Sequence, residues 1–71
     1  MQNYGNRLKT ARIAKGYTQT ELAIILETSQ TSYQRMETGN HDIKMSTIYR
    51  LCKALDISSD WLLGLDTERE E

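Results

Sequence analysis

The sequence has no proline and few glycines, cysteines or histidines, with four, one and one among 71 residues. The single cysteine, Cys52, cannot form an internal disulfide, which fits a reducing cytosol. The longest uninterrupted apolar run, Leu22–Leu26, falls far short of the roughly 18 residues of a membrane span. No basic-then-apolar leader opens the chain. We therefore expect a cytoplasmic protein and not a secreted or membrane-embedded one.

Groups that carry metal or catalytic chemistry are also scarce. His41 is the single histidine, and no second histidine or cysteine lies at ligand spacing from it. An enzyme needs a nucleophile–base pair or a metal set, and most of the acidic residues lie near the C-terminus. We therefore predict no enzymatic activity, no metal and no cofactor, and we interpret Cys52 as a small core residue.

The length and composition predict a single domain. A chain of 71 residues and 8.2 kDa buries only about 60% of the surface that its unfolded form exposes. This size excludes a second catalytic domain or a large cofactor pocket. The 38% hydrophobic and 27% charged residues suit a compact domain and not a disordered chain.

The charges are distributed unevenly, although the net charge is only -1. Residues 1–53 contain eight Lys or Arg and four Asp or Glu, a balance of +4, whereas residues 54–71 contain one Arg and six acids, a balance of -5. The first part can face an anionic partner while the second stays away from it. Residues 66–71 have no apolar anchor, so we expect a flexible acidic tail after a domain of residues 1–65.

Capping residues and glycines predict five short helices. Apolar residues at helical spacing follow Tyr4, and Gly16 is a natural stop after them. Thr18 precedes Glu21 by three residues, which is the spacing of a capping box. No run alternates apolar and polar residues cleanly enough for a strand, so we predict an all-α fold. The other signals are Ser29 and Gly39 around a helix with Tyr33 and Met36, Ser46 before a helix with Ile48, Leu51, Cys52 and Leu55, and Ser58 before a helix with Trp61, Leu62 and Leu65.

The second and third predicted helices are separated by only three residues, Glu27 to Ser29. This is the spacing of a helix-turn-helix, in which the first helix crosses the DNA backbone and the second lies in the major groove. Ala23 has a small side chain that lets the two helices approach closely. Other helical bundles contain similar turns, so the spacing alone leaves a purely structural role open.

The residues around this turn favour the DNA-binding interpretation. The stretches Thr18–Ala23 and Ser29–Gly39, with Leu51–Leu55 and Ser59–Gly64, resemble the lambda repressor and Cro family of regulators. The resemblance covers residues 4–65. It implies a five-helix, all-α DNA-binding domain that acts as a transcriptional regulator, usually as a dimer.

Four positions depart from the family pattern, and one of them is Thr28, which stands where an apolar residue is frequent. Glu27 stands in the turn where the family often has a glycine with positive φ, which costs a non-glycine residue about 1 kcal/mol. Tyr33 and Met36 replace the more usual aliphatic and large apolar residues. We expect Tyr33 to leave its hydroxyl near the DNA.

The resemblance also assigns DNA contacts to individual residues. A glutamine can pair with adenine, a threonine can reach base edges, and an arginine can bind guanine or a phosphate. Gln19 is expected at a phosphate at the start of the second helix, and the loop after Gly39 supplies further phosphate contacts. The expected base contacts are Gln30, Thr31, Gln34 and Arg35, and the expected phosphate contacts are Gln19, Asn40, His41, Lys44 and Arg12.

Two structural roles complete the expected site. Arg12 and Glu37 match a buried or half-buried ion pair of the family that would fix the recognition helix to the scaffold. Trp61, Leu62 and Leu65 are candidates for the dimer interface, with intramolecular packing as the alternative for Trp61 and Leu62.

Two functions remain open at this point. The first is a sequence-specific regulator, a repressor in the simplest case, that binds double-stranded DNA as a homodimer. The second is an antitoxin or adaptor of the same fold whose main partner is a protein. A long apolar or disordered extension would favour the second, whereas residues 66–71 are short and charged.

Overall fold

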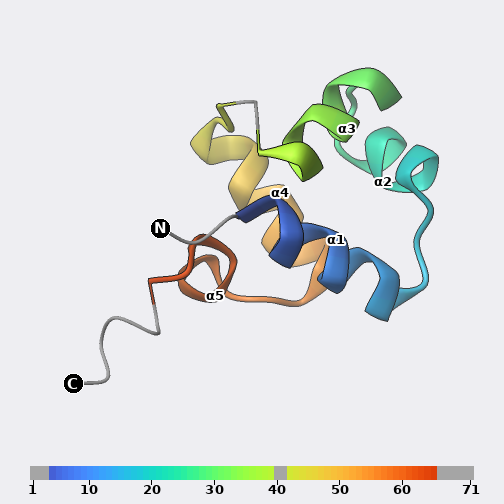
Figure 1. Cartoon of the computed structure of the whole chain (residues 1–71). Helices are drawn as coiled ribbons and strands as arrows, with labels where there is room; N and C mark the ends of the chain where they lie inside the picture. Colours follow the sequence, from blue (N-terminus) through green and yellow to red (C-terminus); the bar gives the residue numbers. More distant parts are fainter. Residues whose placement is uncertain (1–3, 40–41, 66–71) are drawn as a thin grey trace.

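The computed structural model describes residues 4–39 and 42–65 and consists, over those ranges, of helices without strands (Figure 1). This confirms the predicted all-α fold. The five helices are α1 (Tyr4–Lys15), α2 (Gln19–Ile25), α3 (Gln30–Thr38), α4 (Met45–Leu55) and α5 (Ser59–Leu63). Asn40, His41 and the expected acidic tail, residues 66–71, lie outside the described residues.

Side-chain caps begin three of the helices where the sequence predicted them. At α2, Thr18 Oγ1 accepts from the Glu21 amide at 3.0 Å, and the Thr18 amide donates to Glu21 Oε1 at 2.9 Å, which completes the capping box. Ser29 caps α3 and Ser58 caps α5 with a single hydrogen bond each, in which the serine hydroxyl accepts from a backbone amide of the first turn.

The predicted start of α4 is wrong. The helix begins at Met45, and its N-cap is Lys44, which makes no side-chain cap hydrogen bond. The amides of Thr47 and Ile48 both donate to the Lys44 carbonyl oxygen at 3.0 Å. The helical ladder therefore begins before Ser46, which lies in the first turn instead of ahead of it.

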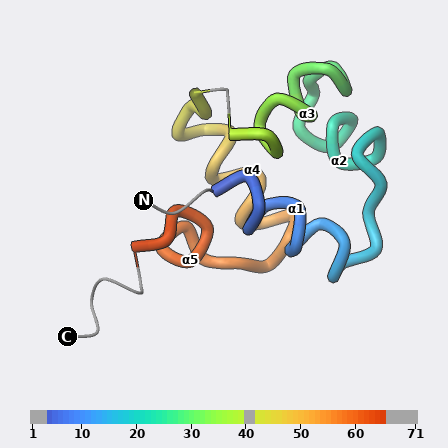
Figure 2. Tube along the Cα trace, viewed as in Figure 1, coloured from blue at the N-terminus to red at the C-terminus, as the bar shows by residue number. Residues whose placement is uncertain are grey.

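The core forms around α1, which packs against α3, α4 and α5. Figure 2 shows α5 beside α1, on the side of the molecule away from α2 and α3. Burial of apolar side chains from all five helices supplies the main stabilisation of such a small domain. The fully buried large side chains are Leu8, Leu22, Tyr33, Leu51, Leu55 and Leu62.

Two contacts of Arg7 tie α1 to α5. Arg7 Nη1 donates to the Trp61 carbonyl oxygen at 2.8 Å, and its guanidinium carbon lies 5.2 Å from the centroid of the Trp61 ring. A cation held over an aromatic face is favourable at this distance. None of the helices in the described ranges is long and apolar enough to cross a membrane.

Candidate nucleic-acid interface

The turn between α2 and α3 has the geometry that the sequence predicted. Glu27 adopts a left-handed conformation with φ 58°, and the Thr28 amide donates to the Ala23 carbonyl oxygen at 3.0 Å. Ala23 is 2% exposed, because its small side chain is covered where the two helices pack. The chain therefore turns within the four residues Leu26 to Ser29 and holds α3 across α2 (Figure 1).

The third helix has one buried and one exposed face. Tyr33, Met36 and Glu37 point into the domain. The side chains on the other face are polar and exposed, so this face is free to enter a DNA groove. It carries all four of the expected base contacts, Gln30, Thr31, Gln34 and Arg35.

The buried face of α3 is joined to α1 by the expected ion pair. Arg12 Nε lies 2.6 Å from Glu37 Oε2, and the two side chains are 11% and 5% exposed. Arg12 Nη2 also donates to Glu37 Oε1 at 3.5 Å, and Nη1 donates to the Tyr17 carbonyl oxygen at 2.9 Å. The pair is confirmed, and it is buried.

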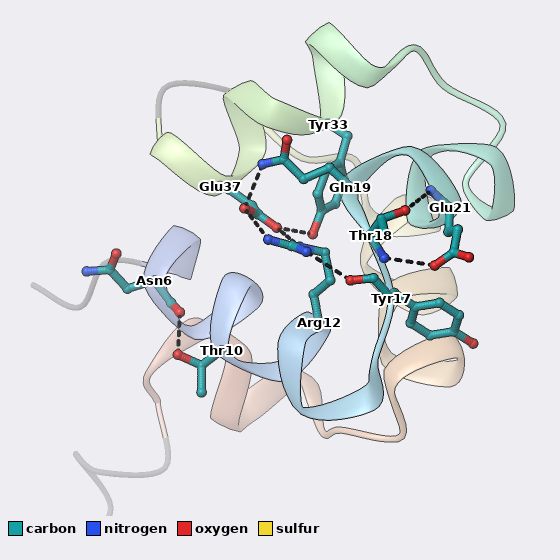
Figure 3. Close-up of polar contacts among 9 residues, drawn as sticks. All are labelled: Asn6, Thr10, Arg12, Tyr17, Thr18, Gln19, Glu21, Tyr33 and Glu37. Carbon is teal, nitrogen blue, oxygen red and sulfur yellow. Dashed lines mark hydrogen bonds and ion pairs between the residues drawn. The ribbon is translucent and has the colours of Figure 1, made fainter.

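Glu37 accepts from two further residues, which the sequence did not predict (Figure 3). The Tyr33 hydroxyl donates to Oε2 at 2.6 Å, and Gln19 Nε2 donates to Oε1 at 3.1 Å. The expectation that the Tyr33 hydroxyl lies near DNA is therefore wrong, because the residue is fully buried. One carboxylate connects α1, the start of α2 and α3.

Burial and hydrogen bonding act in opposite directions on this carboxylate. Burial raises the pKa of Glu37, but the hydrogen bonds from Arg12, Tyr33 and Gln19 outweigh it and hold the pKa below its ordinary value. The hydrogen bond to Glu37 raises the pKa of Arg12. Burial, aided by the bond to Glu37, raises the pKa of Tyr33. The network is thus an ionised pair with a neutral phenol.

Three of the expected phosphate contacts can be placed. Lys44 is exposed at the N-terminus of α4. The expected phosphate contact of Arg12 is wrong, because its guanidinium is buried and bonded to Glu37 and Tyr17. Gln19 is half-buried and gives one amide hydrogen to Glu37, which leaves its second hydrogen for another acceptor.

Comparison with known proteins assigns the domain to a family. The model of the helix-turn-helix family matches residues 8–62, which is most of the chain. The chain belongs to this family of lambda repressor/Cro-type helix-turn-helix domains. The family is one of DNA-binding transcriptional regulators and not of enzymes.

Two curated relatives and one solved structure are similar to this helix-turn-helix domain. The chain is 35% identical over 60 residues to the SPbeta prophage-derived uncharacterized HTH-type transcriptional regulator YonR of Bacillus subtilis, covering 84% of the chain and 56% of that protein. It is 37% identical over 62 residues to the HTH-type transcriptional regulator ImmR of the same organism, covering 87% and 49%. The chain therefore spans about half the length of these relatives.

The solved structure is matched over more of its own length than the two relatives are. The restriction-modification controller protein C.AhdI from Aeromonas hydrophila superposes with a TM-score of 0.77 at 32% identity, covering 84% of this chain and 91% of that one. The arrangement of helices described above is therefore similar to that of an experimentally solved controller protein.

The candidate dimer residues of the domain differ in exposure. Leu62 is fully buried, so its assignment to an interface is corrected: it packs in the core of its own chain. Trp61 is half-buried, and Leu65 lies beyond the end of α5 with 45% of its surface exposed.

An exposed apolar surface on α4 was not predicted. Met45 and Tyr49 are 80% and 63% exposed. Together with Ile48, Cys52 and Ser59 they line a shallow groove between α4 and α5. Residues 45, 48, 49 and 52 are apolar and recur at helical spacing, so the sequence pattern could have predicted this surface. It lies next to the buried face of the same helix, which contains Leu51 and Leu55. Cys52 is accordingly only partly buried.

Proposed function

We propose that this domain is a sequence-specific DNA-binding regulator that inserts α3 into the major groove of a near-palindromic operator. The observation that carries the proposal is the polar, exposed face formed by Gln30, Thr31, Gln34 and Arg35. The opposite face of the same helix is held to α1 by the ion pair of Glu37 with Arg12. Amide, hydroxyl and guanidinium groups on such a face match the hydrogen-bonding edges of base pairs.

Phosphate contacts would position this helix without reading sequence. Lys44 is exposed at the start of α4 and provides a positive charge there. The second amide hydrogen of Gln19 is a donor whose orientation Glu37 sets. Asn40 and His41, which come between α3 and α4 in the sequence, are proposed as the remaining contacts by the resemblance to the family.

Two copies of the domain would bind together. A symmetric dimer places two recognition helices about 34 Å apart, in successive major grooves of one operator. The exposed apolar face of Met45 and Tyr49 on α4 is our candidate for the contact between the copies, together with Trp61 and Leu65 at the end of the domain.

Regulation would follow from occupancy of the operator by the dimer alone. A dimer bound over a promoter excludes polymerase, so the chain would act in the cytoplasm as a repressor without chemistry of its own. The names of the two relatives and of C.AhdI, which describe transcriptional regulators and a controller protein, support a regulatory role.

The test is selection from a random double-stranded DNA library with the purified chain near physiological salt, followed by sequencing. The proposal predicts an enriched inverted repeat. The Gln34→Ala/Arg35→Ala double variant should lose the enrichment while keeping the helical circular dichroism of the parent. A folded chain that enriches no sequence would contradict specific DNA binding and favour a protein partner.

A further inference from the structure

The side chain of Arg7 on α1 contacts both the backbone and the ring of Trp61 on α5. Its Nη1 atom donates to the Trp61 carbonyl oxygen at 2.8 Å, and its guanidinium carbon lies over the Trp61 ring, 5.2 Å from the centroid. One planar guanidinium can make both contacts, because it stacks on aromatic faces and donates hydrogen bonds from its edge. Arg7 therefore restrains Trp61 in two ways.

The Trp61 carbonyl oxygen also belongs to the turn that ends α5. It accepts from the Gly64 amide at 3.1 Å, and the Leu65 amide donates to the Asp60 carbonyl oxygen at 2.8 Å. Gly64 has φ 76°, the left-handed conformation that commonly ends a helix. The hydrogen bond from Arg7 therefore reaches the turn that places Leu65 beyond α5.

This end of the domain carries partly exposed apolar side chains. Trp61 packs against the core but is only half-buried, and Leu65 is 45% exposed. A helix as short as the five residues of α5 is not stable alone, so its contacts with α1 hold these two side chains in place.

The surface around Trp61 and Leu65 suits a protein partner better than DNA. Figure 2 shows α5 on the side of the molecule away from α2 and α3. Residues 54–71 carry a charge balance of -5, which disfavours contact with phosphate groups. A second copy of the chain is the partner that the proposed dimer supplies.

Order in the free protein favours assembly, because an interface side chain that is already held in place loses less conformational entropy on binding. We infer that Arg7 is a positioning residue for the dimer, which holds Trp61 and Leu65 in the arrangement that contacts a second copy of the chain. This inference rests on the proposed function, because it takes the end of the domain as part of the contact between the two copies.

The experiment measures the cooperativity of operator binding, defined as the ratio of the affinities for duplexes with two half-sites and with one. It compares the parent with Arg7→Met, Arg7→Lys and Lys15→Met. Arg7→Met removes the guanidinium, and Arg7→Lys keeps the charge but lacks the planar group that stacks and donates together. Lys15→Met is the matched control, since it removes one positive charge at the other end of α1.

Trp61 provides a second measurement, because it is the single tryptophan of the chain. Quenching of its fluorescence by acrylamide reports how readily solvent reaches the ring. In the parent, quenching should be weaker on the duplex with two half-sites than on the duplex with one, since the second copy covers Trp61.

Both Arg7 variants should lose cooperativity by roughly twofold to tenfold, the range expected for one net hydrogen bond. Arg7→Lys should still bind a single half-site as the parent does, and Lys15→Met should keep the parent cooperativity. Circular dichroism at the temperature of the titrations identifies the folded variants, and Arg7→Lys carries the test if Arg7→Met does not fold. A residue that only stabilised the fold would lower the thermal midpoint and leave the cooperativity of the folded chain unchanged.

Three results would overturn the inference while the proposed dimer survives, because in each of them the parent still binds cooperatively. They are unchanged cooperativity in a folded Arg7 variant, an equal loss in Lys15→Met, and equal quenching of Trp61 on the two duplexes. The last of these would place the contact between the copies elsewhere. A parent that binds two half-sites without cooperativity, or that enriches no sequence, overturns the proposed dimer and the inference with it.

Discussion

Arg12 of α1 and Glu37 of α3 form a buried ion pair whose closest atoms, Nε and Oε2, lie 2.6 Å apart. The two residues are 25 positions apart in the sequence, and the pair connects the helices that carry them. Because α3 carries the proposed base contacts on its other face, the same pair sets where that face lies relative to the rest of the domain.

Replacing Arg12 by alanine should destabilise the domain strongly. Glu37 would then remain as a buried charge without its cation, at a cost of about 3 to 5 kcal/mol in the free energy of unfolding. Urea denaturation followed by circular dichroism measures this loss. Lys15→Ala is the control, since Lys15 contacts Asp56 across 4.0 Å at the surface, where ion pairs contribute little. A loss in Arg12→Ala no larger than in Lys15→Ala would contradict the buried pair.

Acid should destabilise the domain through Glu37. Its pKa in the folded chain lies below the ordinary value of 4.5, so the unfolded chain binds the proton more readily. This contribution to stability is therefore complete above about pH 4.5 and is lost as the pH falls through the lower, folded pKa. Unfolding free energies measured between pH 7 and pH 3 test the sign. Glu37→Gln should be less stable at pH 7 and should lose less stability on acidification than the parent.

Arg35→Ala should weaken operator binding by about 1 to 3 kcal/mol, or roughly 5- to 150-fold, and relax the preference at one base pair. The thermal midpoint should stay near that of the parent, because Arg35 is exposed. Fluorescence anisotropy with the selected operator and single-base variants measures both effects. Arg50→Ala removes the same charge from the exposed surface of α4 and should change the affinity far less. Equal losses in the two variants would argue for a general charge effect.

Lys44→Ala should lower the affinity for DNA about equally for every sequence. It should also flatten the dependence of log Kd on log salt concentration by about one unit. Lys15→Ala is the matched control, since Lys15 is exposed at the end of α1. Titrations at several salt concentrations give the slopes. A loss confined to the selected operator would exclude Lys44 as a phosphate contact.

Tyr49→Lys should disrupt the proposed dimer without unfolding the chain, because 63% of the Tyr49 surface is exposed. Ile24→Lys, on α2, introduces the same charge at a residue that is 70% exposed and should have no effect on assembly. Cooperative binding to an operator with two half-sites, compared with one half-site, reports on the dimer. Loss of cooperativity in Ile24→Lys alone would move the interface to α2.

Much of this domain was predictable from short-range patterns. The capping box at Thr18 and Glu21, the Ser29 cap and the tight turn at Glu27 depend on hydrogen bonds between residues a few positions apart. Such bonds follow from local residue types. The start of α4 was missed because Lys44 provides no side-chain cap, so the nearby Ser46 was the stronger signal.

The sequence by itself determined that the chain forms five short helices with a helix-turn-helix and a polar outer face on α3. Tertiary packing alone decided that Tyr33 and Gln19 both bond to Glu37, that Leu62 belongs to the core and that the apolar face of Met45 and Tyr49 stays exposed. The reason is physical. Periodicity specifies which residues share a face of one helix, but the partner of a buried polar group depends on how distant helices cross, and one carboxylate can accept from any donor that packing brings within reach.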